Sequence, residues 1–390
     1  MIEFDNVKIF TDRIESSALE QLHTLCKSGI FDGQPIRIMP DVHAGAGCVI
    51  GFTVPFKDKI VPNLVGVDIS CGMLCVPLGN VTPDFAKVDE VIKRRIPAGM
   101  NTGDFSPEAR DIFDRLRCRD KIRNRERIES SLGTLGGGNH FIEIDSDGKG
   151  GYYLIVHSGS RNLGVQVAEF YQKIAKTERK EKRTAAVIEK CKAEGRLKDI
   201  NAALIGLKDD PLPKELNYLE GESMQDYLFD AALCGEYADL SRKKMAAVIL
   251  EECFPDADLA GGFTTLHNYI GADGYIRKGA ISARKGQKVL IPLNMRDGCI
   301  VGTGKGNPDW NYSAPHGAGR IMSRAAARAN INLNDYVKSM QGIYSTTVNN
   351  ETIDEAPSAY KPADEIVELV KDTVKVDKRI YPVYNFKAAE

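Results

Sequence analysis

The stretch GGGNHFIEIDSDGKGGYYLIVHSGSRNLG, from Gly136 to Gly164, contains two short apolar runs flanked by glycine-rich turns. The runs HFIEID and YYLIVHS have the length and composition of β-strands, and glycine, asparagine and serine mark the turns around them. His140 therefore lies where one strand begins, and His157 lies where the other ends. A histidine at such a turn projects into a cleft more readily than into a core. The stretch predicts a strand-based scaffold that carries functional histidines.

Five of the six histidines lie in glycine-, asparagine- or serine-rich segments of this kind. The exception is His23, which lies in the helical pattern ALEQLHTLC, where we expect a structural role. A similar glycine-bounded loop, GVDISCGM, begins at Gly66. The other five histidines lie in PDVHAGAG from Pro40, GGGNHFIE from Gly136, VHSGSRNLG from Val156, LHNY from Leu266 and APHGAGR from Ala314. This pattern predicts one catalytic site assembled from the whole chain.

Strand-like and helical segments alternate in large blocks. The first 80 residues carry the strand-like runs IRIMP, CVIGFTVPF and GMLCVPL, and strand-like sequence returns from Gly261. Between them, apolar residues at helical spacing predict a largely helical insertion over about residues 165–255. A further helix is predicted to begin near Gly319. Because the histidine segments lie on both sides of the insertion, the outer blocks must meet, so we predict a single α+β domain over residues 1–390.

Composition describes an ordinary globular chain. With 52 basic and 54 acidic residues, the net charge indicates no partner. The N-terminal residues lack the basic start and apolar run of a signal peptide, and no stretch approaches the roughly 20 apolar residues that cross a bilayer. Nine cysteines without paired spacing fit a reducing compartment. We therefore expect a cytoplasmic protein with no membrane partner.

A basic residue stands at every second position from Arg115 to Arg127. On a helix this spacing would distribute positive charge around the cylinder, so we expect a solvent-exposed helix. Contact with nucleic acid is the alternative, although no aromatic residue is interleaved to stack on bases.

Asp68 and Cys71 are three residues apart in a glycine-bounded loop, so a carboxylate and a thiolate can converge on one point. Together with imidazoles they form a donor set typical of transition metals, and ligand softness alone favours zinc or iron. A thiolate can also bridge two ions, which would clamp the attacking and leaving oxygens of a phosphoryl transfer. The alternative is a turn with a buried thiol, and loop imidazoles that are hydrogen-bonded to the backbone.

Residues beside the histidines also suit a site. Asn139 and Asn268 each adjoin a histidine, and such an amide can fix a tautomer or reach a substrate phosphate. His43 is a metal ligand or a support for one, and Asp41 beside it can orient another imidazole.

His316 differs from the others because HGAGR surrounds it with glycines, whose amides could cradle a phosphate at the start of a following helix. Arg320 would then lie one helical turn further on. A histidine so placed is a candidate nucleophile towards phosphorus. A metal ligand and a general base are the alternatives.

These motifs together resemble the RtcB RNA ligases, the tRNA-splicing and RNA-repair ligases. The resemblance runs nearly end to end, through MPDVHAGAGCVIG, GVDISCGM, LGGGNHFIE, VHSGSRNLG, HNY, RKGAISAR and HGAGRIMSR, to a lysine near the C-terminus. It implies an α+β fold with mixed or antiparallel sheets around a deep metal-containing cleft. It also implies two Mn(II) ions and GTP as cofactors, in place of zinc or iron.

The resemblance implies roles for individual residues. His316 matches the histidine that becomes guanylylated, Asp41 and Arg161 are further catalytic residues, and Arg161 is placed for a contact with an RNA phosphate. The metal ligands match Asp68, Cys71 at the bridging position, His140, His157 and His267. The GTP contacts match Asn139, Glu143, Asn268, Pro292, Asn294, Met295, Cys299, Gly317, Ala318, Gly319 and Lys387.

The implied reaction joins an RNA 3′-phosphate or 2′,3′-cyclic phosphate end to a 5′-hydroxyl end. The histidine attacks the α-phosphate of GTP and expels pyrophosphate, GMP passes to the RNA 3′-phosphate, and the 5′-hydroxyl then displaces GMP. RNA and GTP are the implied partners, and an activator protein is a further possible one. The alternatives are a dinuclear-metal phosphoesterase that acts on RNA ends and an RNA-associated metal protein that has lost the use of GTP.

Two segments depart from the family pattern. PLNMRDGC, from Pro292 to Cys299, replaces a common Pro-Gly-Ser-Met-Gly, so Leu293 and Arg296 add bulk at positions usually held by glycine. Ala46 stands where a lysine is common. These changes suggest the hypothesis of a divergent branch devoted to RNA repair rather than tRNA splicing.

Overall fold

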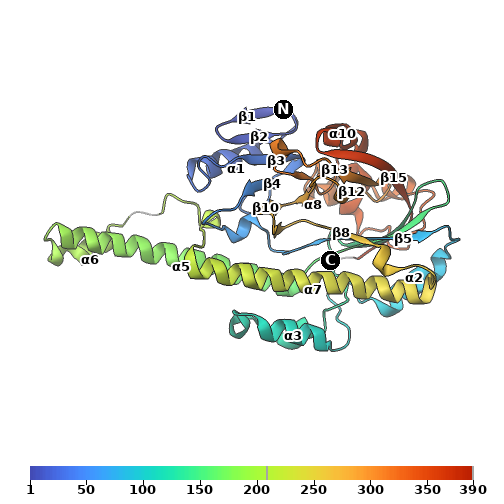
Figure 1. Cartoon of the computed structure of the whole chain (residues 1–390), viewed down its shortest axis with the longest axis horizontal. Helices are drawn as coiled ribbons and strands as arrows, with labels where there is room; N and C mark the ends of the chain where they lie inside the picture. Colours follow the sequence, from blue (N-terminus) through green and yellow to red (C-terminus); the bar gives the residue numbers. More distant parts are fainter. Residues whose placement is uncertain (208–209, 389–390) are drawn as a thin grey trace.

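The computed structural model describes residues 1–207 and 210–388. Figure 1 shows the sheets gathered on one side of two long helices, α5 (Arg161–Ala193) and α7 (Gly221–Cys253), which run side by side. The short helix α6 (Ile200–Ile205) lies at the far end of α5, beyond the sheets. The predicted α+β class and the predicted helical insertion are confirmed, although α5 begins at Arg161, a few residues earlier than expected.

The first large sheet has six strands, drawn from residues 2–55 and 269–278. The pair β2 and β3 is parallel, and every other strand pair in the described chain is antiparallel. In spatial order the strands are β1 (Ile2–Phe4), β2 (Val7–Ile9), β3 (Ile36–His43), β4 (Ile50–Pro55), β10 (Tyr275–Lys278) and β9 (Tyr269–Ile270).

The second large sheet has seven strands, and two further strands, β11 (Ala280–Ser282) and β14 (Ser313–Pro315), pair with each other. Most residues of its central strands are buried, among them the polar residues Glu143, Asp145 and His157. In spatial order the strands are β12 (Lys288–Asn294), β13 (Gly298–Gly304), β15 (Val374–Lys387), β6 (Phe141–Ser146), β7 (Tyr152–Ser158), β5 (Gly72–Gly79) and β8 (Phe263–Leu266).

The helices cover the sheets. Helix α7 turns a row of side chains spaced three and four residues apart into the core, including Tyr227, Cys234 and Tyr237, and α2 packs beside it. The remaining α-helices are α1 (Ser16–Lys27), α2 (Phe85–Arg95), α3 (Pro107–Arg115), α4 (Arg125–Glu129), α8 (Arg324–Asn330), α9 (Leu333–Ser339) and α10 (Ala363–Leu369). No helix in the described residues is long and apolar enough to span a membrane.

Two local predictions are wrong. The chain after His316 is not helical, and α8 begins only at Arg324 because Ser323 accepts a hydrogen bond from the Ala326 amide at 3.1 Å and caps the helix there. The basic run is not one helix either. Helix α3 ends at Arg115, and Asn124 adopts a left-handed φ of 55° before α4.

Candidate active site

Strand ends from both large sheets and from β14 meet at one cavity of about 320 Å³. The loop of Asp68 and Cys71 leads into β5, His140 directly precedes β6, and His157 lies near the end of β7. His267 follows β8 and His316 follows β14. All five sequence-predicted metal ligands and the candidate nucleophile therefore come together, although they span about 250 residues of sequence.

The five candidate ligands form a continuous row of donor atoms. Asp68 Oδ2 lies 3.0 Å from His140 Nε2, which lies 3.4 Å from Cys71 Sγ. On the other side, Cys71 Sγ lies 3.3 Å from His157 Nε2, which lies 3.4 Å from His267 Nε2. The thiol is thus central, with a carboxylate and an imidazole on one side and two imidazoles on the other.

The protonation of two rings tests whether this row fits metal ions. His140 Nδ1 lies 2.9 Å from the Leu135 carbonyl oxygen, and His157 Nδ1 lies 3.1 Å from the Asn139 carbonyl oxygen. Because a carbonyl oxygen only accepts, each Nδ1 donates to its carbonyl, and each Nε2 faces the row. A carboxylate oxygen, a sulfur and imidazole nitrogens that face one another at 3.0–3.4 Å form a donor set that fits metal ions.

Burial sets the protonation of the row. Desolvation lowers the pKa of His157 and His267 well below the ordinary value, so both imidazoles are neutral, the form that binds metal. Desolvation, together with the charge of Asp68, raises the pKa of the Cys71 thiol well above its usual range. A thiolate at Cys71 therefore requires an adjacent cation, and a position between two ions would supply it.

Glycines permit two close approaches in the site. A Cβ on Gly136, which has a φ of 82°, would lie 1.8 Å from Arg161 Nη1, and this guanidinium lies 3.3 Å from His140 Nδ1. A Cβ on Gly159 would lie 2.1 Å from Asp68 Oδ1. Side chains at either position would displace the residues that hold His140, so these glycines shape the site.

Arg242 of α7 holds the loops of the site in place, a role that its sequence context does not indicate. Its side chain is fully buried, and Nη1 donates to the carbonyl oxygens of Ser158, at 2.7 Å, and Ser70, at 3.2 Å. The first carbonyl adjoins His157 and the second adjoins Cys71. A single arginine in the helical insertion therefore ties together the two loops that carry the central donors.

His316 is held by a buried carboxylate. Asp41, on β3, accepts hydrogen bonds at its Oδ2 from His316 Nδ1 at 2.7 Å and from the His316 amide at 3.1 Å. This arrangement leaves Nε2 of His316 as a lone pair without a hydrogen bond in the described residues. The ring centroid lies 4.8 Å from that of His267, so the candidate nucleophile adjoins the donor row. His43 lines the same cavity, and its Nδ1 contacts the Asp41 carbonyl oxygen at 3.0 Å.

Most of the predicted GTP contacts line the cavity. Cys299 does not, and neither do three other predicted site residues. Asp41 contacts His316 on the cavity wall, His140 contacts Asp68 and Cys71 there, and Arg161 lies behind His140. The predicted GTP residues on the cavity wall are Asn139, Glu143, Asn268, Pro292, Asn294, Met295, Gly317, Ala318, Gly319 and Lys387.

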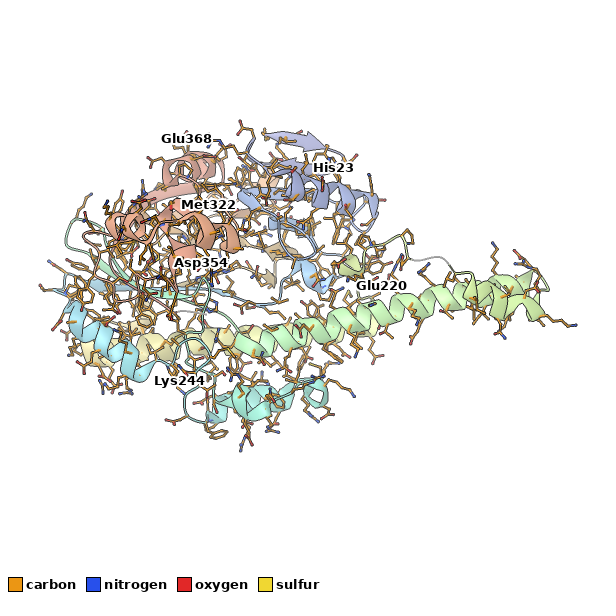
Figure 2. All side chains as sticks on the ribbon, turned by 180° about the vertical axis from the view of Figure 1, so that it is seen from behind. His23, Glu220, Lys244, Met322, Asp354 and Glu368 are labelled. Carbon is orange, nitrogen blue, oxygen red and sulfur yellow. The ribbon has the colours of Figure 1, made fainter. Side chains whose placement is uncertain are left out.

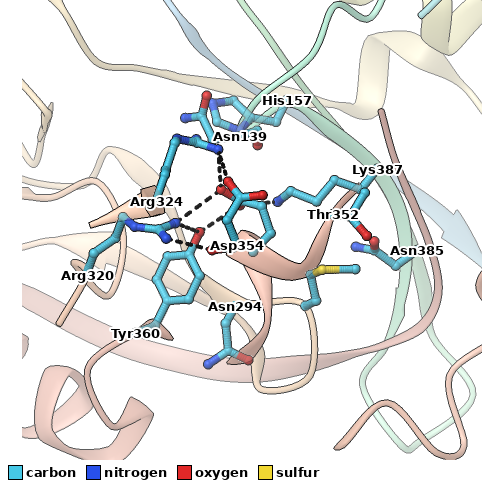
Figure 3. Close-up of polar contacts among 12 residues, drawn as sticks. Asn139, His157, Asn294, Arg320, Arg324, Thr352, Asp354, Tyr360, Asn385 and Lys387 are labelled. Atoms are coloured by element: carbon cyan, nitrogen blue, oxygen red, sulfur yellow. Dashed lines mark hydrogen bonds and ion pairs between the residues drawn. The ribbon is translucent and has the colours of Figure 1, made fainter. Parts of the chain in front are cut away.

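A charged network forms one wall of the cavity, and sequence reasoning found only part of it (Figure 3). Glu355 is buried and accepts from Lys387 Nζ at 2.6 Å, Arg324 Nη1 at 3.0 Å and Arg320 Nη1 at 3.1 Å. Although burial opposes its ionisation, the charges of Lys387 and Arg324 lower the pKa of Glu355 to about 2. The Tyr360 hydroxyl donates to the same carboxylate at 2.7 Å. The network fixes Lys387, the predicted GTP contact.

The segment PLNMRDGC, which departs from the family pattern, forms the turn between β12 and β13, and its own polar residues hold that turn. Asn294 Oδ1 accepts from the amides of Arg296 and Asp297, at 3.0 and 2.9 Å, and its Nδ2 donates to Asp297. Arg296 pairs with Asp297 at 2.8 Å and points away from the core, whereas Leu293 is buried and lines the cavity. Of the two bulky replacements, therefore, Leu293 is the one that reaches the cavity.

A second buried group lies behind the cavity wall. Glu143 and Asp145 share one face of β6, and Cys299 Sγ lies 3.5 Å from Glu143 Oε1. Asn385 donates to Glu143 at 2.8 Å, but neither oxygen of Asp145 has a hydrogen-bond partner among residues 1–207 and 210–388. Desolvation raises the pKa of Glu143 to about 7, and desolvation together with the charge of Glu143 raises that of Asp145 well above its usual range.

Asp145→Asn is expected to stabilise the fold at pH 8 by about 1–3 kcal/mol, because a neutral amide replaces a carboxyl that resists ionisation. In the unfolded chain the carboxyl ionises near pH 4. The wild type therefore loses stability as the pH rises from about 4 towards the raised pKa, and the variant does not. Thermal unfolding at a series of pH values would measure a gain that grows with pH. Asp147→Asn is the control, because hydrogen bonds from the Lys149 and Gly151 amides lower the pKa of this carboxyl instead of raising it, and an equal gain there would contradict the assignment.

These features define a class of protein: an α+β fold whose row of metal donors and carboxylate-held histidine suit metal-dependent phosphoryl transfer. The model of the family described as tRNA-splicing ligase RtcB matches residues 28–116 and 114–388. Two relatives from Escherichia coli, RNA-splicing ligase RtcB1 of strain ATCC 25922 and RNA-splicing ligase RtcB of strain K12, are each 29% identical over 95% of this chain and 94% of their own length. The chain belongs to the RtcB family.

Proposed function

We propose that this protein is an RNA ligase that uses GTP and Mn(II) to join RNA 3′-phosphate or 2′,3′-cyclic phosphate ends to 5′-hydroxyl ends. The observation that carries the proposal is the contact of buried Asp41 with His316 Nδ1, 2.7 Å long, beside a row of five metal donors. Membership of a family whose curated relatives are named RNA-splicing ligases supports the RNA substrate.

Residues of this chain would act in each of the three steps of the reaction. His316 Nε2 attacks the α-phosphorus of GTP, the bond to the bridging oxygen breaks, and pyrophosphate leaves while Asp41 stabilises the proton on Nδ1. GMP then passes from His316 to the RNA 3′-phosphate, which Arg161 and Asn139 would orient. Finally the 5′-hydroxyl attacks the activated phosphate and GMP leaves. A cyclic phosphate end is first hydrolysed: water attacks the phosphorus and the bond to the 2′-oxygen breaks, which leaves the 3′-phosphate and a 2′-hydroxyl.

Two metal sites complete the proposal. Asp68 and His140 would hold one ion, His157 and His267 the other, and Cys71 would serve both. When bound, the ions would neutralise phosphate charge and activate the attacking oxygen. Glu143, Asn268 and the segment Gly317–Gly319 would contact the nucleotide together with Lys387, within one catalytic domain that spans residues 1–390.

A ligation assay with defined RNA ends tests the proposal. We expect joining of a 3′-phosphate strand to a 5′-hydroxyl strand only when both GTP and Mn(II) are present. A metal phosphoesterase, the second candidate, would instead release phosphate without GTP. Joining without GTP, or joining of a 3′-hydroxyl strand to a 5′-phosphate strand, would overturn the ligase chemistry proposed here.

A further inference from the structure

We propose that α5 and the neighbouring basic segment Arg119–Arg123 form a surface that binds the phosphate backbone of the RNA substrate outside the catalytic cleft. This inference rests on the proposed function, because it takes the substrate class from it. In Figures 1 and 2 the far half of α5 extends well beyond the sheets, so much of its circumference is open to solvent.

The charge of this arm differs from that of the whole chain. Ten basic and four acidic residues lie between Lys173 and Lys198, whereas the full chain has 52 basic and 54 acidic residues. Positive charge is therefore concentrated on the element that projects furthest. A local excess of this kind attracts a polyanion even when the net charge of the protein is near zero.

Four of the six lysines of α5 lie on one side of the helix. Lys173, Lys176, Lys180 and Lys190 are exposed, and at 100° per residue they fall within an arc of about 100°. The acidic residues Glu178, Glu181 and Glu189 lie on the other side of the cylinder by the same geometry. Glu169, nearer the body, is the one acidic residue of α5 on the lysine side.

None of these four lysines forms an ion pair with a described residue. Other cations of the arm do: Arg179 pairs with Asp210 at 2.5 Å and Lys182 pairs with Glu220 at 2.7 Å, where the arm leaves the body. The four lysines thus carry charge that no ion pair within the described residues neutralises, and they are available for phosphates.

The basic run adjoins the same face. The Arg123 amide donates to Gln166 Oε1 at 2.7 Å, and Gln166 Nε2 donates to the Arg123 carbonyl oxygen at 3.0 Å. Gln166 is two helical turns before Lys173 on this face. Arg119, Lys121 and Arg123 are exposed, so the surface continues from η2 (Arg119–Lys121) onto the helix.

The surface leads away from the catalytic cleft. Helix α5 starts at Arg161, beside His140, and Lys190 lies about 44 Å further along its axis at 1.5 Å per residue. Lysine side chains bind phosphates as point charges and do not recognise the edges of bases. No aromatic side chain lies among the four lysines to stack on bases. The expected ligand is therefore the backbone of structured RNA next to the ends being joined, bound without sequence preference.

The test compares two full-length variants. The first is Lys173→Gln with Lys176→Gln, Lys180→Gln and Lys190→Gln; the matched control replaces four exposed lysines elsewhere, Lys57→Gln with Lys149→Gln, Lys285→Gln and Lys338→Gln. Binding of a labelled RNA stem-loop is measured over a salt series. We expect the first variant to lose roughly tenfold or more in affinity and to show a salt slope smaller by about 3, as for lost phosphate contacts.

A second readout separates this inference from the proposed function. Labelling of His316 by GTP requires no RNA, and it should be the same in both variants. Equal RNA affinities and salt slopes in the two variants would overturn the RNA surface. Lysine-dependent RNA binding by a wild type that GTP does not label would support the surface while refuting the ligase mechanism, and a wild type that does not bind RNA would refute both.

Discussion

Replacing His316 with alanine is expected to abolish covalent attachment of GMP to the chain and to lower RNA joining by at least about 10⁴-fold, the scale on which an enzyme loses its nucleophile. The geometry gives the reason. Asp41 holds the proton on Nδ1, which leaves the Nε2 lone pair free for attack on phosphorus beside the metal donors. Incubation with α-labelled GTP and Mn(II) would measure the effect, since a phosphorus–nitrogen bond yields an acid-labile protein label.

Two further variants distinguish a nucleophile from a merely structural histidine. Asp41→Asn keeps the shape of the carboxylate but can no longer stabilise positive charge on the ring, so labelling should slow by roughly 10²–10⁴-fold without vanishing. His23→Ala removes an exposed histidine whose ring packs at a tilt against Phe4, and this variant should label like the wild type. Persistence of the acid-labile label in the folded His316 variant would refute the assignment.

The strands and the donors could be predicted because their signals are local. The runs around His140 and His157 carry strand composition, and each functional histidine lies within two residues of a strand end. Convergence of the segments followed from their positions on both sides of the helical insertion. The spacing of Asp68 and Cys71 placed both donors on one loop, as the structure has them.

The contacts that hold the site could not be predicted, because they join residues far apart in sequence. Nothing near Arg242 indicates that its guanidinium would bind carbonyls at Ser70 and Ser158. The pairing of Glu355 with Lys387 depends on β15 reaching the cavity wall. The start of α8 is predictable in principle, since Ser323 is a good N-cap residue, but the glycine-rich sequence after His316 favours an earlier helix start that the structure does not have.

Replacing Cys71 with alanine is expected to remove both metal ions, whereas His267→Ala should remove mainly one. In the donor row the sulfur contacts His140 Nε2 at 3.4 Å and His157 Nε2 at 3.3 Å, so it is the one donor that both halves share. His267 lies at one end and contacts only the half that contains His157 among the five donors. Metal content per chain, measured by mass spectrometry after dialysis against Mn(II), should fall from about two to near zero and to about one, respectively.

A spectroscopic readout makes this expectation independent of catalysis. Co(II) in place of Mn(II) should give a sulfur-to-metal absorption band in the wild type and in His267→Ala, but not in Cys71→Ala, because thiolate is the soft ligand of the set. Cys75→Ala is the matched control, since Cys75 is also fully buried but its sulfur lies outside the donor row. Equal metal content in the wild type and the Cys71 variant would refute the shared position, whereas loss of both ions from His267→Ala would show that the two sites fill only together.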